Sequence, residues 1–289
     1  MKPAPDQGSQ SPITHDQLIR DCRLPRLEAR ALLEHASGQR REWLIAHGDE
    51  PVAEAVVATF TALAQSRRDG QPLAYLVGGC EFRGHHFAVS RDVLIPRTDT
   101  EAIVDWALEL APPAARVIDL GTGSGVIAIS LALERPDLEI WATDISPAAL
   151  TLAAGNAARL LAATGADQNP ITWREGAWWA AIEPGQLFEL AVSNPPYIRA
   201  HDHHLAQGDL RFEPQTALTP GPDGTEAIAA LIDGAPGHLT IGGWLIVEHG
   251  FDQGAAVRAL LAARGFAVIT SRRDTAGHER VTGGRWPGV

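Results

Sequence analysis

The sequence contains very little cysteine. Cys22 and Cys80 are its only two cysteines in 289 residues, and neither belongs to a CxxC or Cys/His spacing. Disulfide-stapled secreted domains carry several paired cysteines, and structural zinc sites need closely spaced ligands. The sequence therefore predicts neither a disulfide framework nor a zinc site, and no other ligand cluster indicates a metal. A reducing cytoplasm is the expected compartment.

Long apolar runs are also missing. A membrane-spanning helix needs about 20 consecutive apolar residues, and every apolar run here is interrupted by acids, glycine or proline. The first dozen residues, MKPAPDQGSQSP, are polar and proline-rich, unlike the apolar core of a signal peptide. We interpret residues 1–12 as a disordered tail and expect no membrane partner.

Positive charge is scarce as well. Lys and Arg total 24 against 35 Asp and Glu, which gives a net charge of −11 at pH 7. A protein that binds a nucleic-acid duplex needs a broad cationic surface to neutralise phosphates, so direct contact with nucleic acid is not expected. Hydrophobic residues make up 45% and charged residues 20%, which is typical of a globular chain and excludes disorder and coiled coils.

The first part of the chain has the apolar spacing of short helices. This pattern covers residues 13–68, with Pro51 expected in a first helical turn and Gly70 as a glycine stop. A small helical domain is therefore predicted over residues 1–72. Residues 73–95 are rich in Tyr, Val, Phe and Ile with glycine punctuation, which predicts a β-hairpin that links two domains.

After Pro96 strands and helices alternate. Near-continuous apolar strands separated by helices are typical of a doubly wound, mostly parallel sheet, so residues 96–289 are predicted to form an α/β domain. The sequence predicts strands at 117–120, 139–144, 188–194, 242–250 and 266–273. It predicts helices at 102–110, 126–134, 147–161, 225–235 and 253–264.

A glycine-rich turn follows the first of these strands. Its residues are Gly121, Thr122, Gly123, Ser124 and Gly125. Glycines let the backbone approach a ligand, and the helix that follows presents unpaired N–H groups. Asp144 ends the next strand, 25 residues after Asp119, where an acid reaches ribose hydroxyls. The spacing is GxGxG and Asp119 would repel a pyrophosphate, so the pattern favours a nucleoside without phosphates.

A second motif, Asn194-Pro195-Pro196-Tyr197, follows the strand at 188–194. The Asn194 side-chain oxygen and the Pro195 carbonyl can accept both N–H groups of a planar amine or amide, and Tyr197 can cover its face. Catalysis would then come from orientation and desolvation without a dedicated base. The pairs at 85–86 and 203–204 are therefore interpreted as surface or hairpin histidines.

These motifs resemble those of known methyltransferases. DLGTGSG resembles motif I of class I S-adenosylmethionine-dependent methyltransferases, and NPPY resembles the acceptor loop of enzymes that methylate adenine N6, guanine N2 or glutamine N5. Further segments make the chain, from about residue 15 onward, similar to the HemK family of release factor glutamine-N5 methyltransferases. These segments are residues 72–76, 81–84, 93–101, 212–214, 217–218, 223–224, 248–250 and 279–281.

The resemblance implies a seven-stranded Rossmann-like sheet and S-adenosylmethionine as donor, with S-adenosylhomocysteine as product. The substrate would be the glutamine in the Gly-Gly-Gln motif of class I peptide chain release factors, gripped by the helical domain of a monomeric enzyme. The implied cofactor contacts are Gly121, Thr122, Gly123, Ser124, Gly125, Asp144, Trp178 (or its neighbour Trp179) beside the adenine, and Asn194. The implied substrate contacts are Asn194, Pro195, Pro196 and Tyr197, of which Asn194, Pro195 and Tyr197 would be catalytic.

Other functions remain open at this point. An adenine-N6 or guanine-N2 nucleic-acid methyltransferase would share both motifs but would need a basic recognition domain. A nicotinamide-dependent oxidoreductase leaves NPPY unexplained, and a nucleoside-binding module without catalysis would not need Asn194. Residues Asp99, Thr100 and Glu101 are expected to cap the helix that follows.

Overall fold

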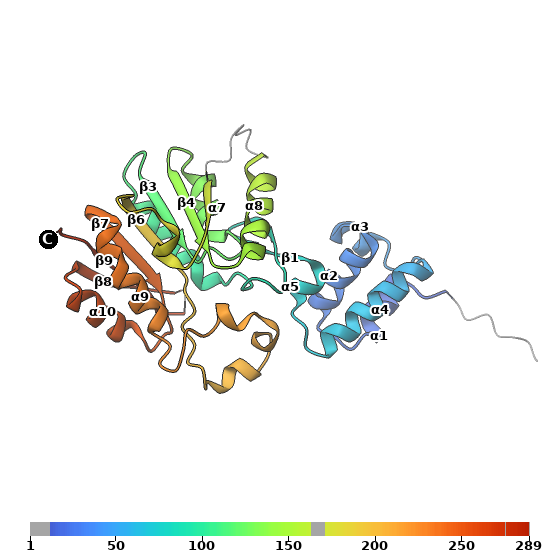
Figure 1. The fold of residues 1–289 in the computed structure, drawn as a ribbon. Helices are drawn as coiled ribbons and strands as arrows, with labels where there is room; N and C mark the ends of the chain where they lie inside the picture. The colour runs from blue at the N-terminus through green and yellow to red at the C-terminus, as the bar shows by residue number, and fades with distance from the viewer. Residues whose placement is uncertain (1–11, 163–170, 275, 289) are drawn as a thin grey trace, which may run out of the picture. The chain divides into compact units, whose positions relative to one another are not determined.

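Figure 1 shows the fold in a computed structural model, which describes residues 12–162, 171–274 and 276–288. The chain divides into two compact units, Met1–Val77 and Gly78–Val289. Almost all of the predicted tail, residues 1–11, lies outside the described residues. Within those described ranges, no helix has the length and apolar character that crossing a membrane requires.

The first unit is a small bundle of helices, as predicted. Apolar side chains at helical spacing form its core, and Leu32, Leu33 and Phe60 are almost completely buried there. Thr14 begins the bundle with a capping box, in which its hydroxyl accepts from the Gln17 N–H and the Gln17 side chain accepts from the Thr14 N–H. The helices are α1 (His15–Asp21), α2 (Arg26–Ser37), α3 (Arg41–Ala46), α4 (Glu54–Arg68) and α5 (Leu73–Val77).

Two predicted boundaries near this unit are wrong. Pro51 does not start a helix: it forms an isolated bridge with Thr14, and α4 begins only at Glu54. Residues 73–77 form α5 instead of the start of a hairpin, because Leu73, Leu76 and Val77 pack at helical spacing against the core of the bundle. The hairpin itself is shorter than predicted and consists of β1 (Gly79–Phe82) and β2 (His85–Ala88).

The second unit contains the predicted doubly wound sheet, with seven strands in the order β5-β4-β3-β6-β7-β9-β8. Strands β3 to β7 pair in parallel, and β9 is antiparallel to both of its neighbours. Strands β5 and β9 were not predicted from the sequence. The strands are β3 (Arg116–Leu120), β4 (Glu139–Asp144), β5 (Ile171–Glu175), β6 (Phe188–Ser193), β7 (Leu239–Glu248), β8 (Ala267–Arg273) and β9 (Glu279–Arg285).

Both faces of the sheet are covered by helices. Alternate residues of each central strand point to opposite faces, so that Val117 packs with α6, α7 and α8 while Ile118 packs with α9 and α10. Because β4 and β5 lie on one side of β3 and β6 lies on the other, the chain reverses its winding direction at β3. The helices are α6 (Glu101–Leu110), α7 (Val126–Glu134), α8 (Pro147–Ala162), α9 (Glu226–Gly234) and α10 (Gly254–Ala263).

Candidate active site

A cavity of about 460 Å³ opens at the carboxyl edge of the sheet. Its walls include residues that directly follow β3, β4 and β6, which is the point where the winding reverses and where open α/β sheets bind ligands. The volume is in the range of small-molecule sites. Among the predicted site residues, those that line the cavity are Gly121, Thr122, Gly123, Ser124, Asp144, Trp178, Asn194 and Pro196.

The three glycines of the turn all have positive φ, but they serve different purposes. A Cβ on Gly121 would lie 2.7 Å from Cζ3 of Trp178, and one on Gly125 would lie 2.7 Å from Cδ1 of Ile129. Gly123 has nothing within 4 Å of the same position. Gly121 therefore seats the Trp178 ring and Gly125 allows close packing around α7, whereas Gly123 leaves space at the cavity.

Asp144 is held rigidly at the end of β4. Its Oδ2 accepts from the Gly123 N–H at 2.9 Å, and its Oδ1 accepts from the Ser146 N–H at 2.9 Å. Each carboxylate oxygen can accept a further hydrogen bond. Asp144 lines the cavity, so its carboxylate can accept hydrogen bonds from a ligand there.

The structure distinguishes the two adjacent tryptophans. Trp178 lines the cavity with φ of 50°. Trp179 is buried, donates its Nε1–H to the Leu231 carbonyl at 2.8 Å, and stacks on His238 with ring centroids 5.0 Å apart. Of the two, Trp178 lines the cavity and Trp179 belongs to the buried core.

Asn194 belongs to a buried chain of hydrogen bonds. Its Nδ2 donates to the Thr100 hydroxyl at 3.0 Å, and that hydroxyl donates to Oε2 of Glu248 at 2.8 Å. The Tyr197 hydroxyl donates to Oε1 of the same carboxylate at 3.1 Å. The Asn194 Oδ1 is buried, and within the described part of the chain nothing donates to it.

The neighbouring motif residues take different positions. Pro196 lines the cavity, whereas Pro195 and Tyr197 do not. In the described residues no group donates a hydrogen bond to the Pro195 carbonyl. Tyr197 packs against the core on the α9 and α10 side of the sheet. The structure therefore leaves two acceptors on consecutive residues, Asn194 Oδ1 and the Pro195 carbonyl.

Thr100 and Glu248 join this site through hydrogen bonds and were not predicted as site residues from the sequence. The Thr100 side chain makes no capping hydrogen bond to α6, so the expectation that residues 99–101 cap that helix is wrong for this residue. Glu248 ends an apolar strand, as Asp144 does, and that position was a usable signal. Asp99 instead pairs with Arg280 at 3.2 Å.

Two buried carboxylic acids have strongly raised pKa values. Burial raises the pKa of Asp119 to about 7, against hydrogen bonds from the Thr122 hydroxyl and the Ala128 N–H. Burial also raises the pKa of Glu248 to about 7, against the hydrogen bonds from Thr100 and Tyr197. The pKa of the Tyr197 hydroxyl is raised by burial and by the nearby Glu248 charge, so this hydroxyl stays a donor.

The cavity wall formed by residues 92–96 is tied to the segment that precedes residues 216–220. The buried Glu213 carboxylate accepts from the Ile95 N–H at 3.3 Å and pairs with the Arg97 guanidinium. Burial raises the pKa of Glu213, and the Arg97 charge opposes that shift. This contact connects two segments that both line the cavity.

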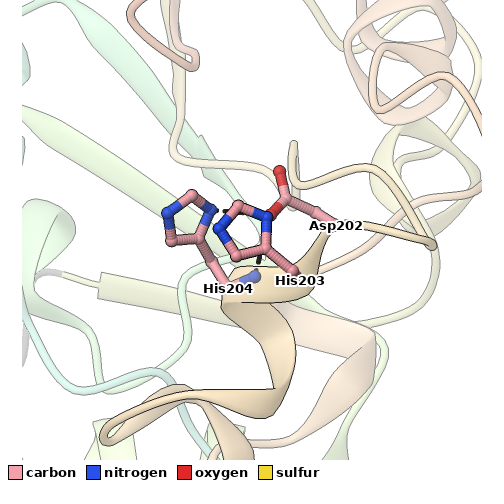
Figure 2. A group of neighbouring side chains, drawn as sticks. All are labelled: Asp202, His203 and His204. Carbon is pink, nitrogen blue, oxygen red and sulfur yellow. Dashed lines mark hydrogen bonds and ion pairs between the residues drawn. The ribbon is translucent and has the colours of Figure 1, made fainter.

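A group of potential metal ligands lies outside the cavity. Figure 2 shows Asp202, His203 and His204, whose ligand atoms all lie within 4.8 Å of one another. Both histidines are exposed, as predicted, and Asp202 Oδ1 accepts from the His204 backbone N–H at 2.9 Å and contacts its Nδ1 at 2.7 Å. Asp202 thereby caps a short 3₁₀ helix, His203–Ala206, which accounts for the arrangement without a metal.

The chain is similar to known proteins in both sequence and fold. A family model described as the methyltransferase small domain matches residues 106–221, and one described as the PrmC N-terminal domain matches residues 17–78. A methyltransferase from Pyrococcus furiosus has a similar fold, with a TM-score of 0.53 and 15% identity, covering 72% of this chain and 91% of that one. The sheet order, the cavity at its winding reversal and the matched model define a Rossmann-like methyltransferase.

Relatives with higher identity narrow this class. The chain is 51% identical over 269 residues to the release factor glutamine methyltransferase of Bordetella pertussis, covering 92% of this chain and 97% of that protein. It is 43% identical to the release factor glutamine methyltransferase of Escherichia coli, covering 91% and 92%. The chain belongs to the release factor glutamine methyltransferase family.

Proposed function

We propose that this protein transfers a methyl group from S-adenosylmethionine to the side-chain amide N5 of a glutamine in class I peptide chain release factors. The glutamine is the one in the Gly-Gly-Gln motif, and its methylation modulates translation termination. The observation that carries this proposal is the buried Asn194 Oδ1, which no described group satisfies, next to the Pro195 carbonyl. A primary amide has two N–H groups, and these two oxygens supply one acceptor for each.

The residues around the cavity fit S-adenosylmethionine. Asp144 would hold the ribose hydroxyls, Trp178 would lie beside the adenine, and the open face of Gly123 would allow close approach of the amino-acid portion. Thr122 and Ser124 also line this wall, although the Thr122 hydroxyl donates to Asp119, whereas Gly125 acts through packing. When bound, the cofactor supplies an electrophilic methyl group on a sulfonium centre.

The chain itself would supply orientation. An amide nitrogen is a poor nucleophile because its lone pair is delocalised into the carbonyl. Asn194 and Pro195 would accept the two N–H groups and fix the plane of the amide, so that the nitrogen lone pair faces the methyl group. Pro196 would add an apolar wall, and Tyr197 would act through its hydrogen bond to Glu248. Fixed geometry and exclusion of water lower the barrier without a dedicated base, and the amide nitrogen loses one of its two protons to solvent after the methyl group has been transferred.

The same pair of acceptors suits the exocyclic amine of adenine or guanine, so a nucleic-acid methyltransferase is the alternative. The net charge of −11 disfavours a nucleic-acid substrate. Family membership favours the release factor. We therefore propose that the enzyme makes no direct contact with nucleic acid and that its helical unit binds the release factor. We also propose that the enzyme is a monomer, is located in the cytoplasm and requires no metal.

The test is to incubate the protein with S-adenosylmethionine and an intact release factor, and then to weigh the digested Gly-Gly-Gln peptide. One added methyl group on the glutamine is expected. A release factor with Gly-Gly-Ala in its place is the control and should gain none. Absence of the methyl group, or methylation of an adenine or guanine in an oligonucleotide, would refute the proposal.

A further inference from the structure

Asn194 can serve the proposed function only if its amide group has one of its two orientations. With Oδ1 toward the cavity it accepts an N–H of the substrate amide, and with Nδ2 there it would oppose two donors. Thr100 contacts the Nδ2 of this amide, on the side away from the unpaired oxygen, and Glu248 in turn contacts Thr100. They are both buried, with 2% and 0% exposure.

Donation along the series of hydrogen bonds from Asn194 through Thr100 to Glu248 runs in one direction. An ionised carboxylate only accepts hydrogen bonds, so Glu248 takes the single hydroxyl proton of Thr100. The Thr100 oxygen can then only accept from the amide, and the amide must offer its Nδ2. The direction of donation therefore turns Nδ2 of Asn194, a residue that lines the cavity, toward Thr100 and leaves its Oδ1 for another donor.

We infer that Thr100 and Glu248 are positioning residues, which act on the substrate amide by locking the orientation of Asn194. This inference rests on the proposed function, because it assigns a purpose to the oxygen that the substrate would contact. Tyr197 supports the same arrangement, since its hydroxyl donates to the other oxygen of Glu248. The carboxylate thus receives a donor on each oxygen.

Protonation of Glu248 would remove this control. The groups that face its carboxylate are the Thr100 and Tyr197 hydroxyls, the Asp99 carboxylate and the Arg280 guanidinium. Asp99 and the burial favour the neutral acid, while Arg280 opposes it. A neutral Glu248 can donate to the Thr100 oxygen. The Thr100 hydroxyl can then donate to Asn194 Oδ1, which allows the Asn194 amide to flip and exchange the positions of Oδ1 and Nδ2. Because the pKa of Glu248 is about 7, kcat should rise with pH through that region.

The test compares kcat and its pH profile for Glu248→Gln, Thr100→Val and Thr100→Ser, with the Gly-Gly-Gln release factor as substrate. Glu248→Gln keeps the shape but can donate as well as accept, and Thr100→Val removes the hydroxyl. Each should lower kcat by at least about tenfold, which is below the usual effect of losing a transition-state hydrogen bond. The Kd for S-adenosylmethionine should change much less. Thr100→Ser should restore activity well above that of Thr100→Val.

The matched control is Thr282→Val, which removes another fully buried threonine hydroxyl. Thr282 Oγ1 lies 2.7 Å from His249 Nε2 and 2.8 Å from Ser271 Oγ, outside the cavity wall. It should keep the kcat and the pH profile of the wild type. In Thr100→Val the rise of kcat near pH 7 should disappear, because no hydrogen bonds then connect Asn194 to the Glu248 carboxylate. The double variant Glu248→Gln/Thr100→Val should have a kcat only slightly lower than that of either single variant, since both substitutions act through the contact between Thr100 and Asn194.

The outcomes separate this inference from the proposed function. If the wild type leaves the Gly-Gly-Gln glutamine unmodified, the proposed function fails. If the wild type is active and folded Glu248→Gln and Thr100→Val keep its kcat and pH profile, the positioning role is refuted. A readout that needs no turnover is the hydrogen exchange of the Asn194 Nδ2 protons. Exchange should be slow in the wild type and faster in Thr100→Val, and equal rates would also refute the inference.

Discussion

Replacement of Gly121 by alanine tests how the glycine turn is built. Gly121 has φ of 77°, and Gly123 in the same turn has φ of 56°. Placing an L residue in this left-handed region costs about 1 to 2 kcal/mol, and both alanine variants bear that cost. They differ in their surroundings: the new Cβ at Gly121 meets Trp178 Cζ3 at 2.7 Å, whereas the one at Gly123 meets nothing within 4 Å.

The expected result is a clear difference in stability. Gly123→Ala should lower the free energy of unfolding by the backbone cost alone. Gly121→Ala should lower it by about 1 to 3 kcal/mol more, which is the usual cost of forcing a side chain into filled space. Because Trp178 also lines the cavity, its displacement should weaken the binding of S-adenosylmethionine by about tenfold or more, since 1.4 kcal/mol is already a factor of ten.

Denaturant unfolding measures the first effect and titration calorimetry the second. A Trp178→Ala background supplies the control, because it removes the ring that the new methyl group would meet. In that background Gly121→Ala should cost no more than Gly123→Ala. If the two single variants have equal free energies of unfolding, or if the extra cost persists without the Trp178 ring, the reasoning is refuted.

Four further predictions follow from the site. Asp144→Asn should weaken S-adenosylmethionine binding by about 10- to 100-fold, because a hydrogen bond to a charged group contributes about 1.5 to 3 kcal/mol; an unchanged Kd would contradict the ribose contact. Asn194→Ala should lower the rate of methyl transfer in a single-turnover assay by about 100-fold or more, with a much smaller change in the Kd for S-adenosylmethionine. The raised pKa of Asp119, about 7 when folded, means that its stabilising contribution is present at pH 4 and is lost as the pH rises to 7, at up to about 1.4 kcal/mol per pH unit; Asp119→Asn should flatten this decline in denaturant unfolding. Methylation of an intact release factor should slow with added salt if the net charge of −11 attracts a basic partner, whereas methylation of a short Gly-Gly-Gln peptide should not.

The order of strands and helices in the second unit was predictable because local pattern and burial agree there. Strand β4 and helix α7 have the predicted bounds, and both have apolar interiors. Strand β9 was missed because Gly283 and Gly284 weaken its strand pattern. The structure explains one of these glycines: a Cβ on Gly283 would lie 2.9 Å from the Leu245 carbonyl oxygen and 3.0 Å from Trp106. That close packing involves residues distant in the sequence.

Part of the candidate site was also predictable from the sequence, and part of it was not. The motifs at residues 121–125 and 194–197 follow strands directly, so the rule that parallel strands end at one edge was enough to bring them together. Thr100 and Glu248 are 148 residues apart, and no local pattern joins them. The choice between Trp178 and Trp179 also needed the structure, because the two are adjacent in the sequence and differ only in what surrounds each ring.

The sequence by itself determined the fold class, the glycine turn and the acceptor motif, because these depend on backbone freedom, on the periodicity of apolar residues and on chemistry carried by neighbouring residues. The tertiary structure decided the orientation of the Asn194 amide, the raised pKa values of Asp119 and Glu248, and the tryptophan that lines the cavity. Each of these depends on burial and on partners from distant segments. Desolvation and the direction of hydrogen-bond donation arise only when those segments meet in the folded chain.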